Sequence, residues 1–297
     1  MGFGKIELGI APIGWTNDDM PQLGGDIPFE QMISEVALAG FAGTEVGGSF
    51  PSAPAVLNKA LEMRGLKIAS QWFSSYLCSV PYKENEEAFL KQLDFLEAVG
   101  ARRVNVCELT RCLFAEKVSM FGEHKPLAND EEWEKLCDGL NRLGKIAAGR
   151  GFKLCFHHHM ATVVQTLEET QRLLDHTDSR YVYLCFDTGH FTFAGEDVVR
   201  AAALFADRTG HVHLKDIRKE KMEQAYREGF AFRQAVLAGC FTVPGDGFVD
   251  FPGVFAELEK KGYSGWMLVE AEQDPALANP FEYALKARKY VREQTGL

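Results

Sequence analysis

The sequence predicts a single (β/α)8 TIM barrel spanning residues 1–297, and three observations favour this fold class. Eight short apolar runs alternate strictly with eight segments of helical period. The sequence has no Gly/Pro/Ser-rich linker near its middle that would divide it into two domains. Four consecutive apolar runs end in His, Asp or Glu, as expected where parallel barrel strands carry an active site at their carboxyl ends.

The predicted strands are apolar runs rich in β-branched residues, and the predicted helices carry apolar residues at helical spacing. The strands are expected at 6–15, 43–47, 66–74, 103–109, 153–159, 182–190, 211–216 and 266–272. The helices are expected at 29–39, 53–64, 85–99, 130–150, 166–175, 197–205, 251–261 and 280–293. The longest irregular stretch, about 219–247, is predicted to form a rim insertion between strands seven and eight, with one short helix at 222–232.

Composition indicates an ordinary globular enzyme, with 46% hydrophobic and 25% charged residues. The net charge of -10 opposes binding to nucleic acid or to anionic membranes, where Lys and Arg must neutralise phosphates. The first residues lack the apolar core of a signal peptide and no run reaches transmembrane length, so we expect a cytoplasmic protein. A homo-oligomer is compatible with these features. The seven cysteines form no CxxC motif and are expected to be reduced core thiols.

The positions of the histidines and carboxylates predict a mononuclear metal site. No histidine precedes His124, and the last four strands then deliver His157, Asp187, His213 and Glu270 at comparable depth near their carboxyl ends. One His in an apolar strand is more often a core residue than a ligand, but four such residues at one rim favour a site. His159 is the reserve ligand. Manganese or cobalt suits this set best, and magnesium or zinc would also fit.

Several segments resemble the inosose (2-keto-myo-inositol) dehydratases of inositol catabolism, within the xylose-isomerase-like barrel superfamily. They include WTNDD, HHHMATVVQT, VPGDG and EAEQDP, whereas DTGH and HVHLKD are widespread in that superfamily. The sequence departs from the family pattern at ELTRCLF (108–114), at GGSF (47–50) and at Ala161, where Gly is usual. These departures lie on the predicted rim, so they bear on the substrate more than on the metal.

The resemblance implies loss of water from a small polyhydroxylated cyclic ketone. A divalent ion would bind the ketone, a base would take the proton beside it, and an acid would protonate the departing hydroxyl. The acid/base candidates are Lys215, His190, His159 and Glu272, with Lys215 or His190 expected as base and His159 as acid. A nearby cation should lower the pKa of Lys215 and favour its neutral amine. The candidates for substrate contacts are Trp15, Asn17, Glu45, Glu108, Arg111 and Asp246.

Three other functions fit parts of the pattern. A keto-sugar epimerase or isomerase would use the same metal site and also begin with an enolate. An endonuclease IV-like enzyme would need histidine ligands from early strands, which this sequence lacks, and its acidity opposes DNA binding. A binding or scaffold protein would hold the metal without turnover.

Overall fold

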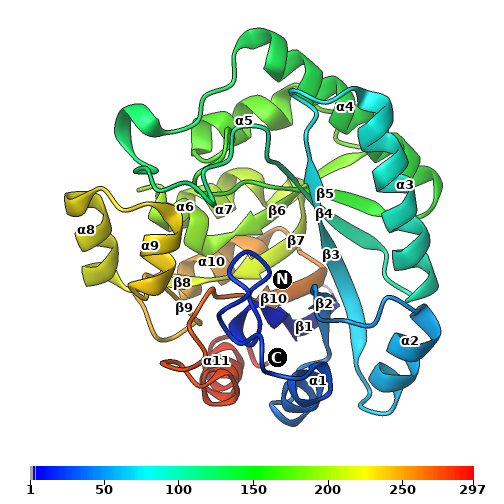
Figure 1. The fold of residues 1–297 in the computed structure, drawn as a ribbon, viewed down its shortest axis with the longest axis vertical. Helices are drawn as coiled ribbons and strands as arrows, with labels where there is room; N and C mark the ends of the chain where they lie inside the picture. Colours follow the sequence, from blue (N-terminus) through cyan, green and yellow to red (C-terminus); the bar gives the residue numbers. More distant parts are fainter. Residues whose placement is uncertain (1–2, 4) are drawn as a thin grey trace.

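The computed structural model describes residue 3 and residues 5–297, and eight parallel strands in it close into a barrel. The strands follow the order β1-β10-β7-β6-β5-β4-β3-β2 around the barrel, and the helices surround them (Figure 1). The barrel strands are β1 (Ile6–Ile10), β2 (Gly43–Val46), β3 (Lys67–Ser75), β4 (Arg103–Glu108), β5 (Lys153–His157), β6 (Val182–Asp187), β7 (Thr209–Leu214) and β10 (Gly265–Val269). The predicted barrel is therefore confirmed.

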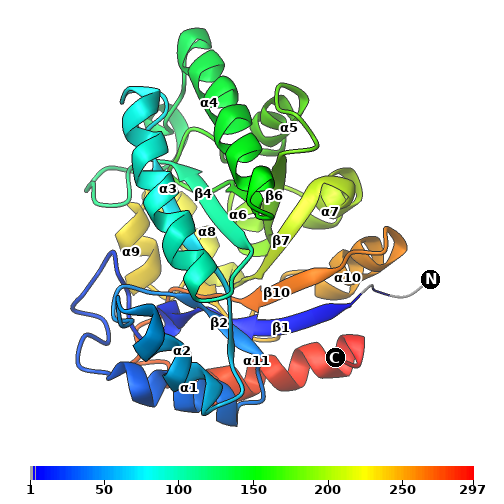
Figure 2. The same ribbon diagram turned by 90° about the vertical axis from the view of Figure 1, so that its right-hand side faces the viewer.

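The main helices cover the outside of the strands and bury one apolar face each (Figure 2). They are α1 (Phe29–Leu38), α2 (Pro54–Glu62), α3 (Tyr82–Ala98), α4 (Asp130–Gly149), α5 (Leu167–Asp175), α7 (Val198–Phe205), α10 (Phe251–Lys260) and α11 (Pro280–Thr295). Side chains cap several of them, and α4 and α5 begin with complete capping boxes at Asn129 and Thr166. No helix in the described part of the chain has the length and apolarity needed to cross a bilayer.

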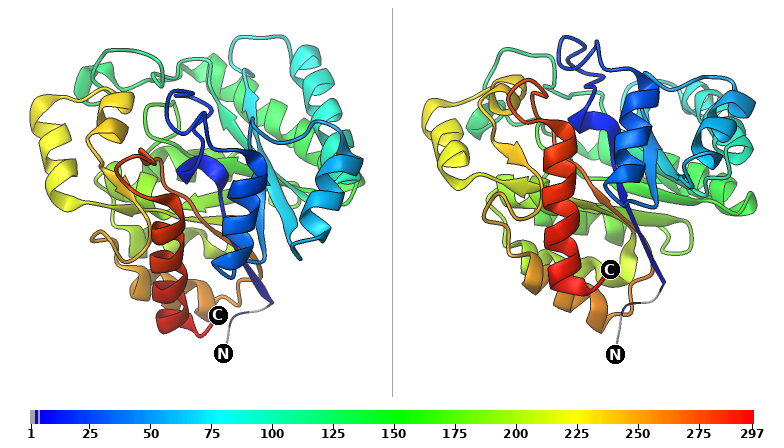
Figure 3. Two further views of the ribbon diagram at one scale, coloured as in Figure 1. Left: turned by 60° about the horizontal axis from the view of Figure 1, so that its bottom comes forward. Right: turned by 90° about the horizontal axis from the view of Figure 1, so that it is seen from below.

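The barrel closes where β1 pairs with β10, in register from Ile6 with Gly265 to Ile10 with Val269. Neighbouring β1 and β2 approach so closely that a Cβ on Gly9 would lie 2.8 Å from the carbonyl oxygen of Gly43. Only glycine fits there without moving the backbone. The flanking helices α1 and α11 contact each other on the outside of the barrel beside this seam (Figure 3).

Five predicted strands run two or more residues past their observed ends, and for the first and the sixth the error has a local cause. The first strand ends at Ile10, and a 3-10 helix, η1 (Pro12–Gly14), follows, because Pro12 has no N–H for the sheet. The sixth strand ends at Asp187, and the DTGH motif turns into the short helix α6 (Thr188–Phe193). Asp187 Oδ1 accepts the backbone N–H of His190 at 2.8 Å, which caps that helix.

The segment between β7 and β10 holds more structure than the single predicted helix. It contains β8 (Asp216–Ile217), α8 (Lys219–Glu228), α9 (Phe232–Leu237) and β9 (Phe241–Thr242), and β8 and β9 pair antiparallel. Gly229, with φ of 66°, ends α8, so the expected continuous helix over 222–232 is wrong. Figure 3 shows α8 and α9 at the same end of the barrel as the loop that follows β1.

Candidate metal centre and active site

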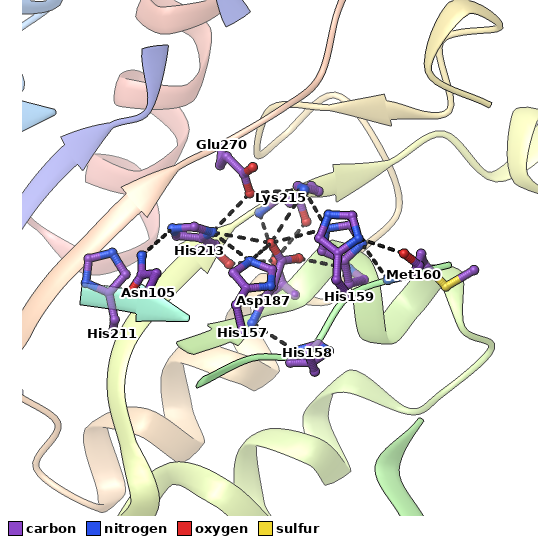
Figure 4. A network of polar contacts seen from close by, with 12 residues as sticks. Asn105, His157, His158, His159, Met160, Asp187, His211, His213, Lys215 and Glu270 are labelled. Carbon is purple, nitrogen blue, oxygen red and sulfur yellow. Dashed lines mark hydrogen bonds and ion pairs between the residues drawn. The ribbon is translucent and has the colours of Figure 1, made fainter. Parts of the chain in front are cut away.

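Four side chains from successive barrel strands converge at the carboxyl ends of those strands. His157 and Asp187 are the last residues of β5 and β6, His213 lies on β7, and Glu270 follows β10 directly. All four are buried or nearly so, with exposed fractions between 0 and 9%. Figure 4 shows them turned toward one another beside Lys215. The expectation that these four side chains meet at the carboxyl ends of their strands is therefore correct. Their role as metal ligands stays a prediction.

The distances among the four side chains match what one ion requires. His157 Nε2 lies 3.1 Å from His213 Nδ1 and 3.6 Å from Asp187 Oδ2. His213 Nδ1 lies 3.7 Å from Asp187 Oδ2 and 3.1 Å from Glu270 Oε2. Ligands bonded to one ion at about 2.0–2.2 Å must themselves lie roughly 3–3.6 Å apart. The two imidazoles and two carboxylates therefore fit a single divalent cation.

Two oxygens in this cluster lack the hydrogen bonds that burial normally demands. Asp187 Oδ2 and Glu270 Oε2 are both shielded from solvent, and neither accepts a well-aligned hydrogen bond from the described residues, although Lys215 Nζ forms ion pairs with them at 3.6 and 3.0 Å. Buried polar atoms without hydrogen bonds are rare, and a place for a bound ion is one established reason for them. Both oxygens belong to the set of atoms that lie within 4.8 Å of one another. This observation supports a cation among them.

The four acid/base candidates adjoin the metal cluster. Lys215 Nζ lies 2.8 Å from His190 Nε2, 3.0 Å from Glu272 Oε1 and 3.0 Å from Glu270 Oε2. The rings of His159 and His190 lie 3.6 Å apart between centroids. His159 Nδ1 contacts the carbonyl oxygen of Met160 at 2.7 Å, which indicates a proton on Nδ1 and a lone pair on Nε2.

Burial and neighbouring charges set the protonation of these groups in the metal-free protein. Burial would lower the pKa of Lys215, but the carboxylates of Asp187, Glu270 and Glu272 outweigh it and raise that pKa above its usual value. Without an ion in the cluster, Lys215 is therefore an ammonium ion, and the neutral amine expected beside a bound cation stays a prediction. Burial raises the pKa of Glu272 to about 7, against the opposing effect of Lys215. Burial also lowers the pKa values of His159 and His190.

A cavity of about 270 Å³ opens above this cluster. One part of its wall is acidic and contains Asp18, Asp19, Glu45, Glu270 and Glu272. Another part is apolar and contains Trp72, Leu109 and Phe114. No Lys or Arg from residues 5–297 lines it. The cavity is therefore acidic and has one face suited to the carbon skeleton of a ring.

The structure places most of the predicted substrate contacts elsewhere. Glu45 lines the cavity, whereas Trp15, Asn17, Glu108, Arg111 and Asp246 do not contribute to its wall in the described structure. Trp15 donates its indole N–H to Glu35, and Asn17 accepts the backbone N–H groups of Asp19 and Met20. Both are buried and hold the loop after β1 in shape, and their direct contact with a substrate stays a prediction.

The other three predicted contacts are occupied by protein partners. Glu108 accepts hydrogen bonds from Ser75, Leu77 and Thr110. Arg111 forms an exposed ion pair with Glu132, 2.7 Å from Nη2 to Oε1. Asp246 pairs with Arg218 at 2.7 Å and with Lys286. Each stabilises a rim loop from outside the cavity.

The sequence interpretation missed the residues that form the rest of the cavity. Leu109 and Phe114 belong to the atypical segment 108–114, which was expected at the rim without either residue being singled out, and the ring centroids of Phe114 and His159 lie 4.5 Å apart. Trp72 lies on β3, and its ring centroid is 5.3 Å from that of His157. The alternation of side chains on β3 was the available signal for Trp72 and Ser74, which share a face with Ser70.

Comparison with known proteins gives a consistent result. The family model described as xylose isomerase-like TIM barrel matches residues 23–294. An inosose dehydratase of Geobacillus thermodenitrificans is 54% identical over 293 residues, covering 99% of this chain and 98% of that protein. An inosose dehydratase of Clostridium perfringens is 52% identical over 293 residues, covering 99% of both proteins.

Solved structures share the fold at much lower identity. The IolI protein with a bound zinc atom has a TM-score of 0.72 at 15% identity, covering 98% of both chains. A D-allulose 3-epimerase from Methylomonas sp. has a TM-score of 0.69 at 20% identity, covering 99% of this chain and all of that one. The fold, the family model and the full-length similarity together confirm the resemblance found in the sequence: the chain belongs to the inosose dehydratases of the xylose isomerase-like TIM-barrel family.

Proposed function

We propose that the protein is a metal-dependent hydro-lyase that removes water from 2-keto-myo-inositol during inositol catabolism. The observation that carries this proposal is its similarity to inosose dehydratases along almost the whole chain. The ligand set and the acid/base groups beside it supply the chemistry that such a reaction needs. The substrate is a small, uncharged cyclic ketone with several hydroxyl groups.

The residues that would hold the ion are His157, Asp187, His213 and Glu270. A divalent ion there supplies a Lewis acid that makes the hydrogen beside a ketone more acidic. Manganese and cobalt suit two imidazoles and two carboxylates, as do zinc and magnesium to a lesser degree.

Two proton-transfer groups line the cavity, and we assign the chemistry to them. His159 presents Nε2 as its unprotonated nitrogen, so it accepts the proton from the carbon between the ketone and the departing hydroxyl. Glu272 delivers a proton to that hydroxyl. Lys215 and His190 are fully buried and do not line the cavity in the described structure. We therefore assign them a supporting role, in which Lys215 contacts Glu272 and the ring of His190 packs against that of His159. This assignment replaces the expected one, in which Lys215 or His190 was the base and His159 the acid.

The cavity wall favours an uncharged polyol over anionic sugars. The five acidic side chains give hydroxyl groups many acceptors, and Asp18 and Asp19, which hold neither the ion nor the transferred proton, repel phosphate or carboxylate groups. Trp72 and Phe114 offer an aromatic surface to the C–H face of a ring.

The test is incubation of the metal-loaded protein with 2-keto-myo-inositol in the presence of manganese, cobalt, zinc or magnesium. We expect an unsaturated or 1,2-diketone product that absorbs in the near ultraviolet and is lighter by one water. The variant His159→Gln should slow the rise in absorbance while the metal content stays unchanged. An epimerised or isomerised sugar of unchanged mass, with no change in absorbance for any metal, would instead establish the epimerase alternative.

A further inference from the structure

A single oxygen of Glu45 accepts hydrogen bonds from four buried side chains. Glu45 Oε1 lies 3.0 Å from His211 Nε2, 3.0 Å from His213 Nε2 and 2.8 Å from Asn105 Nδ2. Ser70 donates its hydroxyl group to the same oxygen. Glu45 stands on β2, and its side chain crosses the barrel interior to reach β7. Glu45 therefore joins β2 and β7 through the barrel interior, although these strands are not neighbours in the barrel.

The ring of His213 joins Glu45 to the metal cluster. Its Nε2 faces Glu45, and its Nδ1 lies 3.1 Å from both His157 Nε2 and Glu270 Oε2. A neutral imidazole carries one proton and one lone pair, and the hydrogen bond made by one nitrogen decides which nitrogen keeps the lone pair. Both nitrogens of His213 face a carboxylate, which only accepts hydrogen bonds, so an ion bound at Nδ1 would leave the ring's one proton on Nε2, opposite Glu45.

We propose that Glu45 is a positioning residue that fixes the tautomer and the ring orientation of His213, so that Nδ1 is the nitrogen that binds the ion. Its negative charge also strengthens His213 as a donor to a cation. This inference rests on the metal site of the proposed function and adds a residue that does not itself touch the ion.

The same three residues offer a competing explanation. Ligand atoms of Glu45, His211 and His213 lie within 4.8 Å of one another and could in principle hold a second ion. However, Asn105 and Ser70 already donate to the oxygen that such an ion would use. Hydrogen bonds therefore account for the cluster without a second cation, and the stoichiometry of metal binding separates the two explanations.

The test compares metal binding by the wild-type protein, Glu45→Gln and the matched control Glu108→Gln. Glu108 is a carboxylate at the end of another barrel strand, it is buried, and its hydrogen bonds do not reach the ligand cluster. Chelator-stripped proteins are titrated with Zn²⁺ against a competing chelator dye, and bound zinc is counted by elemental analysis. The visible spectrum of the Co²⁺ form reports the ligand geometry, and the unfolding temperature without metal reports the fold.

We expect one ion per wild-type chain and an affinity about 10–100-fold weaker in Glu45→Gln, the range typical for partners of ligating histidines. The Co²⁺ spectrum should change in Glu45→Gln and stay unchanged in Glu108→Gln. Equal affinities and spectra for wild-type and Glu45→Gln would overturn this inference alone. An equal loss of affinity in Glu108→Gln would overturn it as well, because general destabilisation would then explain the effect. Two ions per wild-type chain would support the second-ion explanation, and no bound ion would overturn the proposed function together with this inference.

Discussion

Leu113 donates its backbone N–H to the carbonyl oxygen of Ala161 at 2.9 Å, and this contact joins the loops that follow β4 and β5. Ala161 has a φ of 65°, in the left-handed region that glycine adopts most easily. Its N–H in turn donates to Gln165 Oε1 at 2.9 Å. The strained backbone of one rim loop thus supports the other loop, which carries Phe114 against His159.

The substitution Ala161→Gly should therefore stabilise the protein. A side chain in the left-handed region costs about 1–2 kcal/mol, and the greater freedom of glycine in the unfolded chain offsets part of the gain. We expect the free energy of unfolding to rise by about 0.5–1 kcal/mol, measured by denaturant titration where unfolding is reversible. The matched control Ala60→Gly, inside α2, should lower it by about 1 kcal/mol. Equal losses in both variants would contradict the assigned strain.

The substitution Asp187→Asn should remove the metal without unfolding the protein. Asn keeps the acceptor that caps α6 at the N–H of His190, but it lacks the negative charge that a cation needs. Elemental analysis after dialysis should find little metal, and circular dichroism should stay unchanged. Asp197→Asn, a similar change at the cap of α7, should keep the wild-type metal content. Full metal content in Asp187→Asn would disprove the ligand assignment.

The acidic cavity should discriminate against anionic substrates. We expect a phosphorylated or carboxylated keto sugar to react at least roughly 100-fold more slowly than neutral 2-keto-myo-inositol, since placing like charges together costs several kcal/mol. Asp19→Asn should narrow that ratio, measured as kcat/KM, because Asp19 lines the cavity. Asp26→Asn, on the same loop but exposed and away from the wall, should leave the ratio unchanged.

The cysteines should resist thiol reagents until the protein unfolds. All seven are free, and Cys112 alone is partly exposed, whereas the other six are buried. Burial raises the pKa of Cys185 to about 11 and that of Cys155 to about 12, so neither forms a thiolate at pH 8. A disulfide-exchange dye should label at most one thiol per native chain at pH 8 and seven in guanidinium. Raising the pH to 9 should not expose further thiols, because burial limits access as well.

Sequence reasoning located the centre of the site because that centre follows a local rule. In parallel strands of a barrel, alternation along each strand and convergence of the carboxyl ends together place His157, Asp187 and His213 without knowledge of any contact. Glu270 follows the same rule from β10. The barrel itself was predictable for the same reason, since the alternation of runs is visible in the sequence.

The periphery could not be predicted because it depends on contacts between distant residues. Nothing near Arg111 indicates that its guanidinium pairs with Glu132 on α4, nor does the sequence around Asp246 indicate the partner Arg218. The sequence did not indicate the short helix α6 after Asp187. The apolar residues that follow this Asp are equally compatible with a longer strand and with a buried helix that Asp187 caps. The residue types that cap helices or form ion pairs, such as Asp, Glu and Arg, are also the types that contact ligands, so the sequence alone does not separate the two roles.

The pairing of β1 with β10 has a consequence for how the molecule is made. These strands lie far apart in the chain, and such distant contacts form late and slowly in folding. Glu270 follows β10 by one residue position, so the fourth side chain of the ligand cluster reaches its place when the seam closes. During synthesis, a growing chain that has produced His157, Asp187 and His213 still lacks both the seam and a complete set of ligands. Under the proposed function, tight binding of an ion therefore requires the finished barrel, and the bound ion would join the last strand to the three before it.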